Sequence, residues 1–287
     1  MLSEEINFSN LLPFADRDSI NSIVSRLHTV SSDAINSLRG RNVALAFSGG
    51  IDSAIAANLL STSLGSVSLL ALGRDESPDL RTVTKSRYWS QKNMKRVIGK
   101  ISKSDIELAT KEISKIVTVS NLPHFEDCVA FWLIARKAKE IQAVDTLVSA
   151  NGPDELFCGY DRFRRIVDSN GFEAAEREIR LALESAGALG REVRKVVSAF
   201  GLELEEPFLR RPFIEFSLGI PIKYKIALGN DTIRKRIWRY FGRTLGVPED
   251  IVTRPKKAMQ YGMGIHTIVG RMLKRGTLRL EFENSRK

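Results

Sequence analysis

Predicted strands alternate with segments of helical periodicity along the first half of the chain. Residues 43–47 are apolar without alternation, which is typical of a strand buried on both faces, and residues 66–73, 94–99 and 145–150 are the other predicted strands. Apolar residues repeat at helical spacing over 17–39, 78–89, 103–117 and 126–142, and residues 119–127 are predicted to form a loop. Strands that alternate with helices predict an α/β fold with a doubly wound parallel sheet.

The pattern changes after Tyr160, where helical periodicity takes over. Residues 172–186, 188–199, 212–218 and 232–245 are predicted helices, and no further strand is predicted. No internal repeat or low-complexity linker separates two units. We therefore expect one integrated domain, in which an α/β core of residues 1–160 carries a helical C-terminal part of residues 161–287.

The loop "SGGIDS", residues 48–53, joins the first apolar run to a helical segment. Gly49 and Gly50 allow a tight bend and a close approach to a ligand. The N–H groups at the start of the following helix have no intrahelical partner, and Ser48 and Ser53 add hydroxyl groups, so the loop is typical of an anion site. The alternative is that the same residues only cap the helix.

Asp52 is the unusual member of this loop, because a carboxylate repels a phosphate unless a cation lies between them. A magnesium ion that bridges Asp52 and phosphate oxygens resolves the conflict. The loop lacks the lysine of a G-x-x-x-x-G-K-S/T phosphate loop. It resembles instead the PP-loop of the ATP pyrophosphatases, which implies that ATP is bound, that pyrophosphate leaves whole and that the reaction takes place at the α-phosphate.

Composition narrows the function classes further. The net charge is +10, which favours a polyanionic partner such as tRNA, but the basic residues are scattered along the chain. Two cysteines, Cys128 and Cys158, are too few for a disulfide framework or a metal knuckle. No apolar run reaches membrane-spanning length, and the N-terminus lacks the pattern of a signal peptide. We expect a cytoplasmic protein without a membrane partner.

Several segments, in this order, resemble the synthetase domain of the asparagine synthetases and the related β-lactam synthetases. They are "SGGIDS", "LALGRDESPDL", "FEDCVAFWLIARKAKE", "SANGPDELFCGY", "SAFGLELEEPFLRRPFIEF" and "TRPKKAMQYGMG". The fourth resembles the pattern S-G-E-G-x-D-E-x-F-G-G-Y, and the fifth resembles S-x-x-G-x-E-x-R-x-P-F-L-D. The resemblance covers nearly the whole chain and implies an ATP-dependent ligase that adenylates a carboxylate.

The resemblance also assigns roles by position. Pyrophosphate and Mg²⁺ would be held by Ser48, Gly49, Gly50, Asp52 and Ser53, with Asp154 as the second metal ligand and Glu155 and Gly152 beside it. Leu72, Gly73, Ser149 and Ala150 would border the adenosine. Lys256 would stabilise charge that develops near the α-phosphate, as a fixed cation can; Lys257 is its neighbour, and a solvated turn is the alternative for this loop.

Three departures from the family pattern concern the acyl substrate. Asn151 stands where asparagine synthetases have glutamate, and the β-lactam synthetases have a tyrosine paired with the glutamate that Glu203 matches. Glu205 replaces an arginine, and Arg210 replaces an aspartate. We therefore expect Asn151 and Glu203 to lie beside the acyl substrate and expect aspartate to be a poor substrate.

The sequence is compatible with several nitrogen donors. Glutamine-using members of the family begin with a cysteine nucleophile, whereas Met1 is followed here by Leu2. We expect a chain without a glutaminase domain, which takes nitrogen from ammonia, an amine or a separate glutaminase subunit. Two alternatives remain open: an enzyme that adenylates a tRNA base or another nucleic-acid-linked substrate, and a non-catalytic module with the same fold. The sequence leaves homo-oligomerisation open.

Overall fold

A computed structural model describes residues 17–75, 77–85, 93–255 and 259–280. Its centre is a five-stranded parallel sheet of β1 (Val43–Ala46), β2 (Val67–Gly73), β3 (Met94–Lys100), β4 (Thr146–Val148) and β5 (Glu203–Glu205). The strand order is β3-β2-β1-β4-β5, and the register pairs Leu45 with Leu69 on one side and with Val148 on the other. The expected α/β class with a parallel sheet is confirmed.

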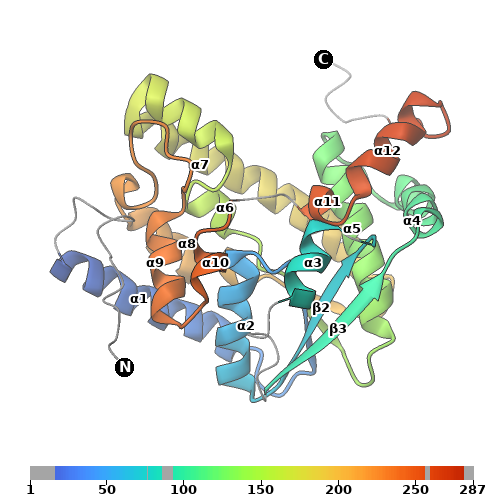
Figure 1. The fold of residues 1–287 in the computed structure, drawn as a ribbon, viewed down its shortest axis with the longest axis horizontal. Coiled ribbons are helices and arrows are strands. Elements are labelled where there is room, and N and C mark those ends of the chain that lie inside the picture. Colours follow the sequence, from blue (N-terminus) through green and yellow to red (C-terminus); the bar gives the residue numbers. More distant parts are fainter. Residues whose placement is uncertain (1–16, 76, 86–92, 256–258, 281–287) are drawn as a thin grey trace.

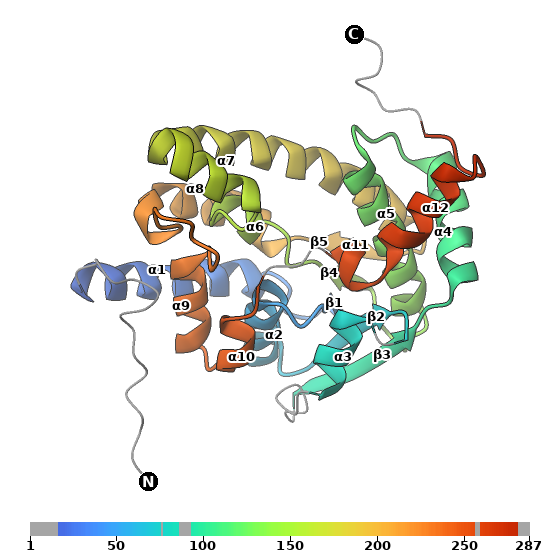
Figure 2. The same cartoon turned by 45° about the horizontal axis from the view of Figure 1, so that its top comes forward.

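Helices cover both faces of this sheet, as the unbroken apolar runs predict. One face packs Val43 and Leu45 against α1 (Arg17–Asn36), α2 (Ile51–Leu64), α8 (Arg211–Gly219) and α9 (Arg236–Thr244). The other face packs Ala44, Leu70 and Leu147 against α4 (Lys103–Ile116), α5 (Leu122–Lys139), the end of α7 (Asp161–Ser198) and α12 (Ile265–Lys274). Figures 1 and 2 show α1, α2 and α9 on one side of the sheet and α4, α5 and α12 on the other.

The remaining elements are short. They are α3 (Pro78–Lys85), α6 (Pro153–Leu156), the 3₁₀ turns η3 (Pro207–Leu209) and η4 (Ile222–Tyr224), α10 (Glu249–Val252) and α11 (Met259–Gly262). A smaller core between the first part of α7 and η4 contains Cys158, Phe163 and Ile222. No helix in the described ranges is both long and apolar enough to span a lipid bilayer.

Several elements differ from the sequence expectation, and the helix α12 was not predicted. The predicted loop 119–127 is in large part helix, because Asn121 accepts a hydrogen bond from the His124 N–H and caps α5. Proline is tolerated there because the first turn needs no donor. The two helices expected over 172–199 belong to one helix, α7, which is kinked at Gly171 (φ 77°). The strand β5 was not predicted at all, although it forms the edge of the sheet beside β4.

Candidate active site

The candidate site is a cavity of about 390 Å³ at the carboxyl ends of β1 and β4. Ligands bind at this end of open parallel sheets because the connecting loops diverge there. The PP-loop and the loop after β4 form one part of its wall, and the start of α5 together with the middle of α7 forms another. The wall is completed by Lys235, Arg239, Arg254, Pro255 and Met259. The C-terminal half of the chain therefore contributes directly to the site.

Residues 48–53 form a compact turn around the start of α2. The Gly50 N–H donates to Ser48 Oγ (3.3 Å), and Ser53 Oγ donates to the Gly50 carbonyl (3.1 Å). Gly49 has a φ of 70°, which favours glycine. No side chain caps α2 at Gly50, so its first N–H groups remain available to an anion. Arg254 donates to the Gly49 carbonyl (3.3 Å) and brings a cation to the same turn.

Two carboxylates from the first turns of two helices, α2 and α6, meet on one buried ammonium group. The Lys235 Nζ lies 2.6 Å from Asp52 Oδ2 and 2.6 Å from Asp154 Oδ1. The other oxygen of Asp52 accepts a hydrogen bond from Trp238 Nε1 (2.9 Å). The Lys235 side chain is only 1% exposed, whereas those of Asp52 and Asp154 are 18% and 15% exposed. All three residues line the cavity, and the lysine is the least exposed of them.

Gly159 provides the space in which Asp154 and Lys235 meet. A Cβ at this position would lie 2.1 Å from Asp154 Oδ1 and 2.2 Å from Lys235 Cε. Lys235 itself has a left-handed backbone conformation (φ 50°, ψ 34°) at the start of α9, which is uncommon for a residue other than glycine and needs support from its surroundings.

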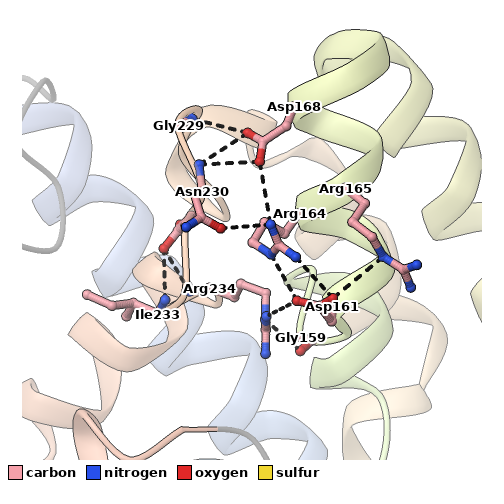
Figure 3. A network of polar contacts seen from close by, with 10 residues as sticks. Gly159, Asp161, Arg164, Arg165, Asp168, Gly229, Asn230, Ile233 and Arg234 are labelled. Carbon is pink, nitrogen blue, oxygen red and sulfur yellow. Dashed lines mark hydrogen bonds and ion pairs between the residues drawn. The ribbon is translucent and has the colours of Figure 1, made fainter.

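A polar network supports the loop that precedes Lys235 (Figure 3). Arg234 donates to Asp161 Oδ1 (3.0 Å) and to the Gly159 carbonyl (3.1 Å), so the residue beside Lys235 is tied to the start of α7. Asp161 also accepts from Arg164 (2.9 Å), and Arg164 donates to Asn230 Oδ1 (2.7 Å). Charge-assisted bonds of this kind are stronger than neutral ones.

Two further aspartates hold the same loop by its backbone. Asp168, which belongs to α7, accepts a hydrogen bond from the Gly229 N–H of the loop (3.1 Å). Asp231 accepts from the N–H groups of Ala227 and Ile233, both at 2.9 Å, and from Arg236 Nε (2.6 Å). The loop is thus fixed from both sides, and Lys235 is fixed with it.

The carboxylates of Asp52 and Asp154 fit a magnesium ion. Both can approach one cation, as their shared contact with Lys235 shows, and carboxylate oxygens are the donors that Mg²⁺ prefers. Over the described ranges no cluster of three or more His, Cys, Asp or Glu residues could hold a metal. Mg²⁺ is commonly bound through one or two carboxylates together with substrate phosphates and water, and Asp52 and Asp154 match that donor set.

Sequence reasoning missed two cations of this site, Lys235 and Arg239. Arg239 lies one helical turn after Lys235 and is 1% exposed. Burial lowers the pKa of its guanidinium, while Asp52 and Asp154 oppose this effect. The sequence did contain a signal for their burial. Both residues stand beside the apolar stripe of Ile237, Trp238 and Phe241 in α9, and a helix face that packs on the core also buries the residues next to it.

The end of the cavity between α5 and α7 carries titratable groups of a different kind. Tyr160 donates to Glu155 Oε1 (2.5 Å), and burial together with this carboxylate raises the pKa of Tyr160 well above its usual value. Ser185 lies 3.1 Å from His124 Nε2, and burial lowers the pKa of this imidazole. Asp127 and Arg162 also line this end, which can therefore bind a polar substrate of mixed charge.

Most of the predicted site residues come together in the cavity. Those that line it are Ser48, Gly50, Asp52, Ser53, Ser149, Ala150, Asn151 and Asp154. Gly49 and Gly152, with φ values of 70° and 113°, shape the two loops. Leu72 and Gly73 end β2 and are not among the lining residues. Lys256 lies outside the described residues, although Arg254 and Pro255 just before it line the cavity.

The structure does not bring Glu203 to Asn151. Glu203 is 57% exposed and pairs with Arg41 (2.6 Å) at the sheet edge, because the alternation along β5 directs Leu204 inward instead. Asn151 contacts Glu206, three residues further on. Glu205 and Arg210 pair with each other at 2.7 Å and do not line the cavity, so their charges offset one another away from the substrate.

The two cysteines are not nucleophiles of this site. Cys128 and Cys158 are both free and buried. Burial raises the pKa of each thiol to about 12, so the reactive thiolate is scarce near neutral pH. They act as small apolar residues of the core.

Comparison with known proteins agrees with this geometry. The chain is 26% identical over 302 residues to a Methanocaldococcus jannaschii protein assigned as a glutamine-hydrolyzing asparagine synthetase, an alignment that covers 95% of this chain and 53% of the relative. The human glutamine-hydrolyzing asparagine synthetase is 24% identical over 260 residues, which covers 85% of this chain and 44% of the human protein. The chain thus spans about half the length of the curated relatives it matches.

A solved NMN synthetase from Francisella tularensis aligns with 92% of this chain and 98% of its own at 12% identity, but the TM-score of 0.32 is too low to support an inference. The model of the asparagine synthase family matches residues 36–195 and 185–281. The match covers most of the chain and includes both loops that carry the paired carboxylates, so the protein belongs to the asparagine synthase family.

Proposed function

We propose that this protein is an ATP-dependent, AMP-forming ligase that adenylates a carboxylate, releases pyrophosphate and transfers the acyl group to ammonia or an amine. The observation that carries the proposal is the meeting of Asp52 and Asp154 on Lys235 beside the uncapped start of α2. Carboxylates, buried cations and free N–H groups in one cavity suit a magnesium-bound polyphosphate.

Each part of the site has a task in this reaction. Asp52 and Asp154 would hold Mg²⁺, which neutralises phosphate charge when it is bound. The N–H groups at the start of α2 and the Ser48 and Ser53 hydroxyls would bind the β,γ-pyrophosphate. Arg254 adds a cation at the same turn, and a fixed cation stabilises the charge on the departing pyrophosphate.

The remaining assignments follow the family resemblance. Lys256 would act near the α-phosphate, where charge develops as the acyl oxygen attacks. Ser149 and Ala150, with Leu72 and Gly73 behind them, would border the adenosine. The end of the cavity between α5 and α7 would receive the acyl group and the amine. A separate glutaminase subunit could supply ammonia, and a cytoplasmic location would suit an ATP-dependent ligase.

The test is product analysis with a panel of carboxylates. ATP, Mg²⁺ and each carboxylate are incubated with ammonia or hydroxylamine, and AMP, ADP, pyrophosphate and phosphate are quantified. We expect AMP and pyrophosphate in equal amounts, only with an accepted carboxylate. Glu215→Gln is a matched control, because Glu215 pairs with Arg211 on the surface and is 60% exposed. ADP and phosphate as the only products would refute the proposal.

A second candidate is adenylation of a nucleic-acid-linked substrate, and one observation favours it. A groove between α4 and α12 is lined by Lys103, Lys111, Arg271 and Arg275, with Glu107 as its one acidic residue. Clustered cations bind phosphate backbones and make the affinity salt-dependent. RNA that co-purifies with the protein and is released by salt would support this candidate over a free carboxylate.

A further inference from the structure

Asn151 contacts a buried carboxylate, and the family pattern specifies no residue type at the position of that carboxylate. Its side-chain Nδ2 donates to Glu206 Oε1 at 3.2 Å. Glu206 is 8% exposed, and it does not line the cavity, whereas Asn151 does. The amide therefore stands between the substrate space and the charge behind it.

The surroundings of Glu206 are shaped to hold its carboxylate in this place. Gly190 of α7 leaves room for it, because a Cβ there would lie 2.9 Å from Glu206 Oε2. Arg194, one turn further along α7, places its Nη2 3.6 Å from the same oxygen. Burial raises the pKa of Glu206, whereas Asn151 and Arg194 lower it and Glu205 opposes them.

The backbone on the other side of the contact is fixed as well. The Asn151 N–H donates to Ser149 Oγ (3.2 Å), and the Ser149 N–H donates to the Glu205 carbonyl (2.9 Å). Gly152 packs directly on the segment after Glu206, because a Cβ there would lie 2.6 Å from the Phe208 carbonyl oxygen. The two residues therefore keep one relative position.

This arrangement decides which end of the Asn151 amide faces the substrate. An amide has a donor end and an acceptor end, and the donor end is engaged by Glu206. We propose, on the basis of the function proposed above, that Glu206 is a positioning residue that fixes Asn151 with its carbonyl oxygen toward the cavity. The acyl substrate then meets an uncharged acceptor at this wall and presents an uncharged N–H or O–H donor to it.

The experiment exchanges the two functional groups. In the double variant Asn151→Asp/Glu206→Gln, the carboxylate lines the cavity and the amide lies behind it. The side-chain length at each position is unchanged. The probes are carboxylates that differ only by an ammonium group: aspartate and succinate, and glutamate and glutarate. Pyrophosphate release is measured for each. We expect the ratio of ammonium-bearing to ammonium-free substrate to rise about tenfold, because a charged contact is stronger than a neutral one.

Single variants separate positioning from a general structural effect. Glu206→Gln retains an acceptor for Asn151, so it should keep the native substrate ratio. Glu206→Leu frees the amide and should raise KM for the accepted carboxylate while KM for ATP stays the same. Equal changes in both KM values, or an unchanged ratio in the double variant, would overturn the proposal.

Unfolding by urea tests the residue pair without any substrate. Asn151→Asp alone places two carboxylates in contact and should destabilise the protein, and Glu206→Gln should restore most of the loss in the double variant. Additive losses would overturn the pairing. If the native protein releases no pyrophosphate with any carboxylate, the proposed function and the substrate assignment both fail, whereas non-additive unfolding would still establish the pair.

Discussion

Lys235 and Asp52 are 183 positions apart in the chain, and the ammonium of one lies 2.6 Å from the carboxylate of the other. The same ammonium also contacts Asp154 at 2.6 Å. The three residues come from the starts of α9 and α2 and from the loop after β4. Lys235 offsets the repulsion between the two carboxylates, so the site proposed above for Mg²⁺ would be assembled before the ion binds.

Replacement of Lys235 by methionine should destabilise the fold in a way that Mg²⁺ partly reverses. Removal of one partner of a buried ion pair costs about 3–5 kcal/mol, and the partial exposure of both aspartates favours the low end. Urea unfolding with and without Mg²⁺ measures this. The variant should gain more stability from Mg²⁺ than the native protein does. An equal gain in both would mean that the ion does not bind between Asp52 and Asp154.

Asp52→Asn should lower kcat/KM for ATP by on the order of 100-fold or more, because it weakens a metal ligand and leaves Lys235 with one carboxylate. The asparagine retains an oxygen that can accept from Trp238, so folding should suffer less than activity. Steady-state pyrophosphate release over a range of Mg²⁺ concentrations checks the prediction. A variant with native Mg²⁺ dependence would place the metal elsewhere.

Gly159→Ala should disturb the ion pair between Asp154 and Lys235 in the wall of the cavity. Its Cβ would lie about 2 Å from Asp154 Oδ1 and Lys235 Cε, and overpacking of this kind typically costs about 1–3 kcal/mol. Thermal unfolding and Mg²⁺ titration measure the effect. Gly187→Ala is the matched control: a Cβ there meets nothing within 4 Å on α7, and alanine favours helix.

A strand could be predicted from the sequence where it contains several consecutive apolar residues, and it was missed where it contains only one. β2 was predicted because it contains four consecutive apolar residues, 69–72, and six of its seven residues are buried. β5 was missed because only Leu204 of its three residues is apolar, and a single buried residue has no periodicity. The start of α5 was missed because Pro123 suggested a loop, although Asn121 carries the capping signal.

The candidate site divides in the same way. Residues 48–53 could be proposed as an anion-binding loop from the sequence because they are contiguous and their chemistry explains their order. Lys235 could not be predicted from local pattern, because its partners Asp52 and Asp154 are distant in the chain. Glu203 was predicted from its motif position alone, whereas the structure places Glu206 next to Asn151. The two glutamates can be distinguished only once the pairing of β4 with β5 is known.

Lys256→Ala should lower kcat by on the order of 100-fold or more and change nucleotide affinity little, if the residue acts only on charge that develops during adenylation. Single-turnover pyrophosphate release and nucleotide binding separate the two effects. Lys257→Ala is the neighbouring control and should keep most activity. The reverse result, an active Lys256→Ala and an inactive Lys257→Ala, would move the assignment by one position.

The last prediction concerns pH and His124. Burial lowers the pKa of its imidazole in the folded protein, so between that lowered value and the unfolded value of about 6.5 the unfolded chain binds more protons. The contribution of neutral His124 to stability is therefore fully present above about pH 6.5 and is lost as the pH falls through the folded pKa. His124→Asn removes this titration and should make the unfolding midpoint less sensitive to pH between about 7.5 and 5. His28→Asn is the control, because His28 is exposed and should leave the native pH dependence in place. A native pH dependence in His124→Asn would show that other groups account for the loss of stability in acid.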